Sequence, residues 1–158
     1  MTGDRGWALL AYRLPREPST PRIALWRKLK RLGVAQLGDG LVALPHDSRT
    51  REAFDWIADE VIAAGGEATV WLAQPGTKAQ ERAIAQRMAA AVAAEYESVS
   101  ERAAAANGAP AVEQRRTAAR LRRELQRIRR RAYFPPPEQE RAEAAVAQLA
   151  SQLEEASR

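Results

Sequence analysis

The chain has 158 residues and is basic, with 25 Lys and Arg against 20 Asp and Glu and a net charge of +5. This length suits one domain, or a small domain with an appendage, and the charge permits nucleic acid or another anionic partner. Cysteine is absent, which excludes disulfides, thiolate metal sites and thiol redox chemistry. No apolar run is long enough to span a bilayer, and the N-terminus does not resemble a signal peptide. We therefore expect a cytoplasmic protein with no membrane partner.

Six short elements are predicted in the first half of the chain. Trp7–Leu14 is almost continuously apolar, as expected for a strand covered on both faces. Ser19 or Thr20 is a natural N-cap ahead of a basic helix, and Asp39-Gly40 is a two-residue hairpin signal. The elements alternate as strand, helix, strand, strand, helix, strand, over residues 7–14, 20–32, 34–37, 41–44, 47–64 and 68–73. This order predicts an α+β fold of the ferredoxin-like βαββαβ type, an antiparallel sheet with both helices on one face.

The second half is predicted to be an α-helical extension. Its pattern indicates three helices, at 78–106, 111–133 and 138–156, separated by an Asn-Gly-Ala-Pro break and by three consecutive prolines. Their apolar stripes are thin, so we expect them to pack on one another, on the open face of the sheet or across a dimer interface. We accordingly divide the chain into a ferredoxin-like domain at 1–76 and a helical, Arg-rich extension at 77–158.

Neither the tryptophans nor the motifs of the sequence indicate a catalytic or ligand-binding role. The four tryptophans, Trp7, Trp26, Trp56 and Trp71, occupy core-like positions in the expected elements and are interpreted as core rather than as base-stacking platforms. The sequence also lacks a Ser-His-Asp set, a Gly-rich phosphate loop and a Cys nucleophile. We therefore expect no enzyme activity, no metal site and no cofactor.

The densest positive charge lies on the second helix of the extension. Nine arginines face a single opposite charge, Glu124, between positions 115 and 131, a net of +8. One set falls opposite the apolar stripe of Leu121, Leu125 and Ile128: Arg116, Arg120, Arg123, Arg127 and Arg130. Arginine binds phosphate in bidentate fashion, so this face is a candidate for nucleic-acid binding. The alternative is a solvated face paired with glutamates of the neighbouring helices.

A second basic segment is the helix at 20–32, where Arg27, Lys28 and Arg31 point away from the leucine stripe. Taken alone, these three cations and Lys30 beside leucines are typical of any amphipathic surface helix. Together with the preceding Arg16…Arg22 loop and the Arg-rich helix, they are added as candidate nucleic-acid contacts.

The segment YRLPREPSTPR, followed by LWRKLKRLG, the Asp-Gly hairpin with Leu-Pro and then GGEATVW, resembles the N-terminal domain of the ChrB family of chromate-resistance proteins. The resemblance covers most of the chain, including the AYFPPPE stretch. That family is related to the regulatory domain of PaaX-type repressors and to small ferredoxin-like CRISPR nucleases. Those nucleases place an Asp at or just after the first strand, where this chain has Tyr12 and Arg13, which argues against metal-dependent cleavage.

The resemblance implies a cytoplasmic, chromate-responsive transcriptional regulator. Our leading hypothesis is therefore a homodimeric, DNA-binding repressor of chromate resistance. The alternative is a protein-interaction module that docks on a separately encoded sensor domain, because long members of the family carry a second domain that this chain lacks.

Chromate, a tetrahedral dianion similar to sulfate, is the effector that the resemblance implies. A site for it needs N–H donors and fixed positive charge, and the loop before the basic helix offers both. The candidate anion-binding residues are Arg16, Ser19, Thr20 and Arg22. The alternative is structural: Ser19 caps the helix and Arg16 pairs with Glu17 or with the extension.

Overall fold

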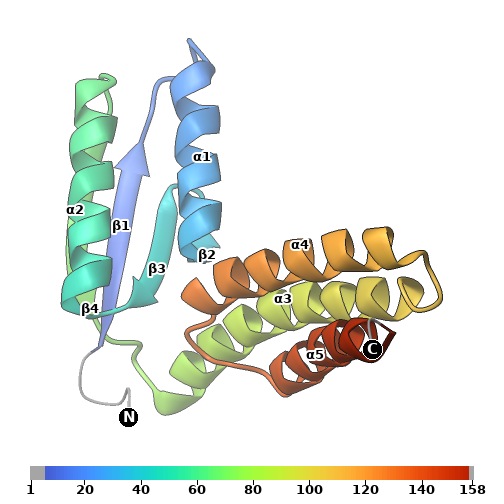
Figure 1. Cartoon of the computed structure of the whole chain (residues 1–158). Helices are drawn as coiled ribbons and strands as arrows, with labels where there is room; N and C mark the ends of the chain where they lie inside the picture. Colours follow the sequence, from blue (N-terminus) through green and yellow to red (C-terminus); the bar gives the residue numbers. More distant parts are fainter. Residues whose placement is uncertain (1–5, 157–158) are drawn as a thin grey trace. The chain divides into compact units, whose positions relative to one another are not determined.

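A computed structural model describes residues 6–156 of the chain. The residues fall into two compact units, Met1–Ala85 and Gln86–Arg158, and each is described by itself. The first unit contains β1 (Trp7–Arg13), α1 (Thr20–Leu32), β2 (Ala35–Gly38), β3 (Leu41–Pro45), α2 (Ser48–Ala63) and β4 (Glu67–Ala73) (Figure 1). The helices that follow are α3 (Lys78–Ala105), which begins in the first unit, α4 (Ala111–Arg130) and α5 (Glu138–Ala156).

The four strands form one sheet in the order β2-β3-β1-β4, and every neighbouring pair is antiparallel. The expectation of a mixed α and β fold with a four-stranded antiparallel sheet is confirmed. Leu10, near the middle of β1, pairs with Val42 of β3 on one side and with Val70 of β4 on the other. The apolar run therefore forms an inner strand, as its composition predicted.

The core of the first unit lies between the sheet and two helices that cover the same sheet face (Figure 1). Strands β1 and β3 and both helices contribute buried apolar side chains: Ala8, Leu10, Val42, Leu44, Leu25, Leu29, Phe54, Ile57 and Val61. Helix α2 begins at a capping box in which Asp47 accepts from the Thr50 backbone N–H at 2.7 Å and donates its own N–H to the Thr50 hydroxyl at 2.9 Å. Helix α1 ends at Gly33, which adopts φ 76°.

The interpretation of all four tryptophans as core is wrong. Trp7 is 3% exposed, but Trp26, Trp56 and Trp71 are 42%, 65% and 56% exposed. The reason is geometric: Trp26 and Trp56 lie beside the buried stripes of α1 and α2, whereas Trp71 is on the edge strand β4. An aromatic ring one helical position from a buried stripe is turned toward solvent, and composition alone does not distinguish the two cases.

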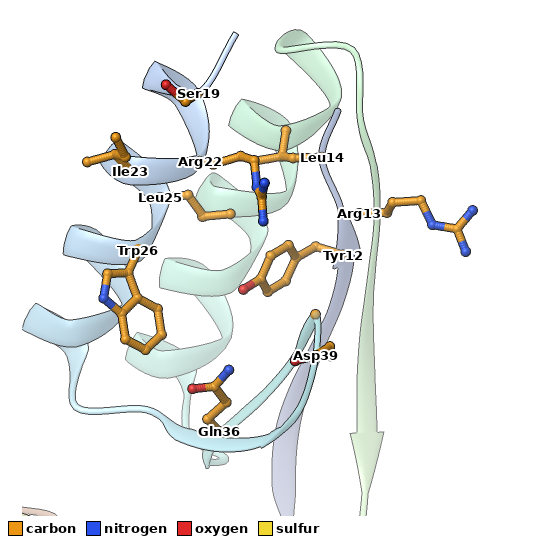
Figure 2. Close-up of a pocket in the computed structure, with 11 residues that line it drawn as sticks. Tyr12, Arg13, Leu14, Ser19, Arg22, Ile23, Leu25, Trp26, Gln36 and Asp39 are labelled. Carbon is orange, nitrogen blue, oxygen red and sulfur yellow. The ribbon is translucent and has the colours of Figure 1, made fainter. Parts of the chain in front are cut away.

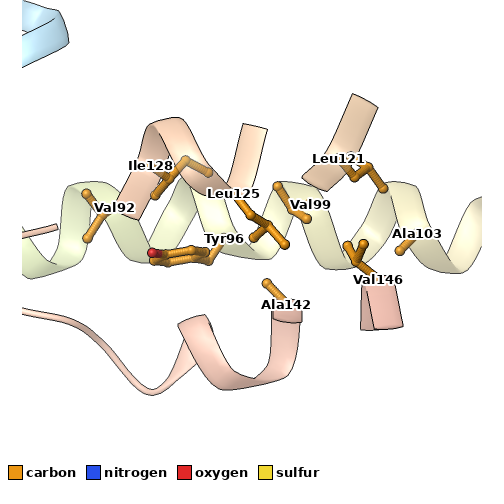
Figure 3. Close-up of a cluster of buried hydrophobic side chains, with 9 residues drawn as sticks. All are labelled: Val92, Tyr96, Val99, Ala103, Leu121, Leu125, Ile128, Ala142 and Val146. Atoms are coloured by element: carbon orange, nitrogen blue, oxygen red, sulfur yellow. The ribbon is translucent and has the colours of Figure 1, made fainter. Parts of the chain in front are cut away.

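The second unit is a packed three-helix cluster. Buried side chains from all three helices meet in it: Val92, Tyr96, Val99 and Ala103 of α3, Leu121, Leu125 and Ile128 of α4, and Ala142 and Val146 of α5 (Figure 3). The extension helices therefore pack on one another, one of the three arrangements expected from their thin stripes. Helix α4 ends at Arg130, earlier than the expected Tyr133.

None of the helices among residues 6–156 combines the length and the apolar character that a membrane span requires.

Candidate functional site

The face of α4 opposite the helix cluster is formed by arginine side chains. Ala118, Leu121, Leu125 and Ile128 are buried on one side of this helix. The five arginines predicted to lie opposite that stripe are all exposed: Arg116, Arg120, Arg123, Arg127 and Arg130. We call these five side chains the arginine face. At a rise of about 1.5 Å per residue, the face extends over about 21 Å along the helix.

The glutamates of the neighbouring helices pair with other arginines. Arg102 of α3 donates to the Glu124 carboxylate of α4 through its two terminal guanidinium nitrogens, Nη1 at 2.9 Å and Nη2 at 2.6 Å. Arg129 contacts Glu143 of α5 at 2.5 Å, and Arg131 contacts Glu95 of α3 at 2.6 Å. Within residues 6–156, no ion pair joins any member of the arginine face to an acidic side chain. Pairing with glutamates of the neighbouring helices therefore holds for Arg129 and Arg131, which lie outside the arginine face.

These ion pairs also fix the charge state of Glu124. The hydrogen bonds from Arg102 lower the pKa of the Glu124 carboxyl, and Arg127 and Arg131 add smaller effects in the same direction. Glu124 thus stays ionised, and Arg102 of α3 compensates its negative charge. The positive charge on the outward side of α4 remains available to an external anion.

The basic residues of α1 are placed differently. Arg27 and Arg31 are exposed, whereas Lys28 is half-buried and forms an ion pair with Glu60 of α2. Two of the three predicted contacts on this helix are therefore open to a partner, and the third is engaged within its own unit. The structure does not bring the α1 and α4 residues into one described site, because they belong to different units.

A pocket of about 810 Å³ in the first unit lies between α1, the end of β1 and the β2–β3 hairpin (Figure 2). Of the four predicted anion-binding residues, Ser19 and Arg22 line it, and Arg16 and Thr20 do not. Arg16 and Thr20 are both exposed. The pocket therefore contains only half of the predicted anion site.

Ser19 occupies the N-cap position of α1 without capping the helix through its side chain. Its backbone is helical, with φ −75° and ψ −19°, and its hydroxyl makes no hydrogen bond to the first turn. A capping side chain requires an extended backbone at this position, as Asp47 shows on α2 with φ −148°. The hydroxyl of Ser19 is consequently available at the rim of the pocket.

Sequence reasoning did not identify the other polar and aromatic residues of the pocket. They come from three separate elements: Tyr12, Trp26, Gln36 and Asp39. Burial raises the pKa of the Tyr12 phenol, Arg22 lowers it and Asp39 raises it, so all three groups are electrostatically close. The one local signal was the Asp-Gly hairpin, which is joined to β1 by the bond from the Tyr12 N–H to the Gly40 carbonyl at 2.8 Å.

A family model and a curated relative both match this chain and point to the same family. The family described as "Protein ChrB, N-terminal" matches residues 22–107. Protein ChrB of Cupriavidus metallidurans is 31% identical over 145 residues, which cover 89% of this chain and 44% of that protein. The chain thus spans less than half the length of this curated relative. No solved structure matches it.

Proposed function

The chain belongs to the ChrB family, and from this premise we propose that it is a cytoplasmic, DNA-binding repressor of chromate resistance. The observation that carries the proposal is the arginine face of α4, whose five exposed side chains form no ion pair within residues 6–156. A surface helix usually balances its charges with nearby opposite ones. The five arginines of this face instead form no ion pair with a described acidic side chain, whereas Arg129 and Arg131 do.

The arginine face suits the phosphate backbone of DNA. Guanidinium groups bind phosphate oxygens in a fixed, bidentate geometry, and about 21 Å of helix spans roughly six phosphates of one strand. Such contacts position a protein on the duplex without reading its sequence. Arg27 and Arg31 of α1 are proposed as further phosphate contacts, whereas Lys28 would first have to leave Glu60.

We also assign the first unit to the ferredoxin-like class. The element order β1-α1-β2-β3-α2-β4 and the sheet order β2-β3-β1-β4 support this assignment. The fold itself does not specify a function, so the proposal depends on the arginine face and on family membership.

A homodimer is part of the proposal, and β4 is the element that favours it. This strand is at the edge of the sheet, has no charged residue after Glu67 and exposes Trp71 and Leu72 at 56% and 52%. Exposed, uncharged edge strands are ready to pair with another chain. The same feature supports the second candidate, a module that docks on a separately encoded partner.

The deciding experiment measures binding of the full chain to DNA from its own promoter, by gel shift and by fluorescence anisotropy over a range of salt concentrations. One variant replaces Arg116, Arg120, Arg123 and Arg127 with Gln. The matched control replaces four exposed cations elsewhere with Gln: Arg51, Lys78, Arg82 and Arg141. Both variants lose the same net charge, so they separate a local effect from a general one.

We expect the arginine-face variant to bind DNA far more weakly than the wild type. The slope of its log affinity against log salt should be shallower by about 3 to 4, since each lost phosphate contact removes about 0.9 from the slope. The control is expected to bind like the wild type. Equal binding by both variants would reject the arginine face as the interface. Absence of any shift, together with co-purification of a partner, would favour the docking module.

A further inference from the structure

The pocket beside α1 has the size and lining of a site for an organic ligand. Its volume of about 810 Å³ lies within the range of about 300–1,000 Å³ typical of sites for cofactors and drug-sized ligands. Leu14, Ile23 and Leu25 supply an apolar wall, and Trp26 presents its indole ring at 42% exposure. A tetrahedral oxyanion would fill only a small part of this space.

The charged groups of the pocket are not paired with each other. Arg22 and Asp39 both line the pocket, and neither forms an ion pair or a side-chain hydrogen bond with another residue in the described part of the chain. In Figure 2 the Arg22 side chain points down toward Tyr12, while Arg13 points away from the pocket. The site therefore offers one inward cation, one carboxylate and the hydroxyls of Tyr12 and Ser19.

These groups follow one another along the pocket in an order that restricts the ligand. Ser19 lies at one end, the Arg22 side chain extends toward Tyr12 in the middle, and Trp26, Gln36 and Asp39 lie toward the other end (Figure 2). A single guanidinium suits one phosphoryl group, and an exposed indole suits a flat heterocycle. Asp39 requires that the ligand also carry hydrogen-bond donors, because a simple aromatic anion would be repelled by this carboxylate.

We propose that this pocket binds a nucleoside monophosphate. Arg22 holds the phosphate, Trp26 stacks on the base, and Gln36 faces the base edge. Asp39 accepts hydrogen bonds from the ribose hydroxyls. The site lies within the first unit and does not depend on the DNA-binding function proposed for α4.

The test titrates the full chain with AMP, GMP, CMP and UMP by isothermal calorimetry, and follows tryptophan fluorescence in parallel. We expect saturable binding of one nucleotide per chain to at least one of the four. Arg22→Gln is expected to weaken it about tenfold or more, since a charge-assisted hydrogen bond is lost. Lys30→Gln, about two turns along the same helix and outside the pocket, is the matched control and is expected to bind like the wild type.

Fluorescence gives an independent readout, since Trp7, Trp56 and Trp71 do not line this pocket. Nucleotide is expected to quench the wild type and to leave Trp26→Phe unquenched. Sulfate that binds as tightly as the nucleotides would overturn the proposal and leave an oxyanion site only. The proposal is also overturned if no nucleotide binds at millimolar concentration, or if Arg22→Gln binds nucleotide with unchanged affinity. Gel shifts on the same variants test DNA binding separately. Nucleotide titration of the arginine-face variant shows whether the pocket binds nucleotide when the DNA interface fails.

Discussion

Gly40 holds the β2–β3 hairpin against the inner strand. It adopts φ +70°, and a Cβ there would overlap the carbonyl oxygen of Tyr12. Its own carbonyl accepts from the Tyr12 N–H at 2.8 Å. We expect Gly40→Ala to lower the free energy of unfolding by about 2 kcal/mol or more, because the left-handed conformation alone costs an L-residue about 1–2 kcal/mol. Chemical denaturation measures the change.

The matched control for Gly40 is two residues away. Gly38 has a negative φ, and a Cβ there meets nothing within 4 Å. Gly38→Ala is therefore expected to be neutral, or to stabilise slightly by restricting the unfolded chain. Equal losses in both variants would mean that the close approach of Gly40 to Tyr12 does not constrain the hairpin.

Asp47 makes the start of α2 sensitive to acid. The Thr50 backbone N–H donates to its carboxylate, and this bond is the main reason that the pKa of Asp47 lies below its ordinary value of 3.8. A carboxyl with a lowered folded-state pKa stabilises the fold above its ordinary pKa, and the effect is lost as the pH falls through the folded-state pKa. Asp47→Ala is expected to cost about 1 kcal/mol at neutral pH, the usual value of a cap.

Asp47→Asn separates the cap from the charge, because the amide oxygen still accepts from Thr50 but does not titrate. We expect its stability at neutral pH to lie close to that of the wild type. The wild type should then lose stability relative to Asp47→Asn below about pH 4. Thermal melts over this range measure the difference, and parallel pH profiles would count against the assigned pKa shift.

At the scale of elements, regular patterns were sufficient to predict the helices and strands. The buried stripe of α4 was predicted from helical periodicity and is confirmed. The exposed tryptophans were not predicted, because an aromatic residue gains free energy from burial only if a neighbouring element covers it. Trp26 meets no such element and lines a pocket instead. Local sequence specifies the helix, whereas the burial of a side chain beside its apolar stripe depends on which other elements pack there.

Tyr96 is the least expected member of the α3–α4–α5 cluster. The side chain is 0% exposed, and within residues 6–156 its hydroxyl has no hydrogen-bond partner. Burial raises the pKa of this phenol. A buried hydroxyl without a partner costs about 1–3 kcal/mol, so Tyr96→Phe is expected to raise the free energy of unfolding by about 1 kcal/mol. Tyr96→Ala should lower it by about 3–5 kcal/mol through the cavity. Denaturant titration distinguishes these results, and a destabilised Tyr96→Phe would indicate a bound water at the hydroxyl.

For the whole molecule, sequence reasoning identified the arginine face but only part of the pocket. The arginines are neighbours on one helix, so helical periodicity alone predicts that they share a face. The pocket instead joins Tyr12, Trp26 and Asp39 from a strand, a helix and a hairpin, and only the folded chain shows that they are adjacent. Arg16 and Thr20 were grouped with Ser19 and Arg22 because they are close in sequence, and the fold separates the two pairs.

This separation makes the chromate hypothesis testable within the whole chain. Arg22 and Ser19 remain candidates to bind a tetrahedral dianion, while Arg16 lies outside the pocket. A ligand that binds only the folded state raises the melting temperature by mass action. Chromate, and sulfate more weakly, are expected to raise the Tm of the wild type and of Arg16→Ala, but not that of Arg22→Ala, when melting is followed by circular dichroism. With one inward guanidinium the binding should be weak, so millimolar anion is needed. No shift in the wild type at that concentration would assign chromate sensing to a partner, and a shift that depends on Arg16 would place the anion on the loop outside the pocket.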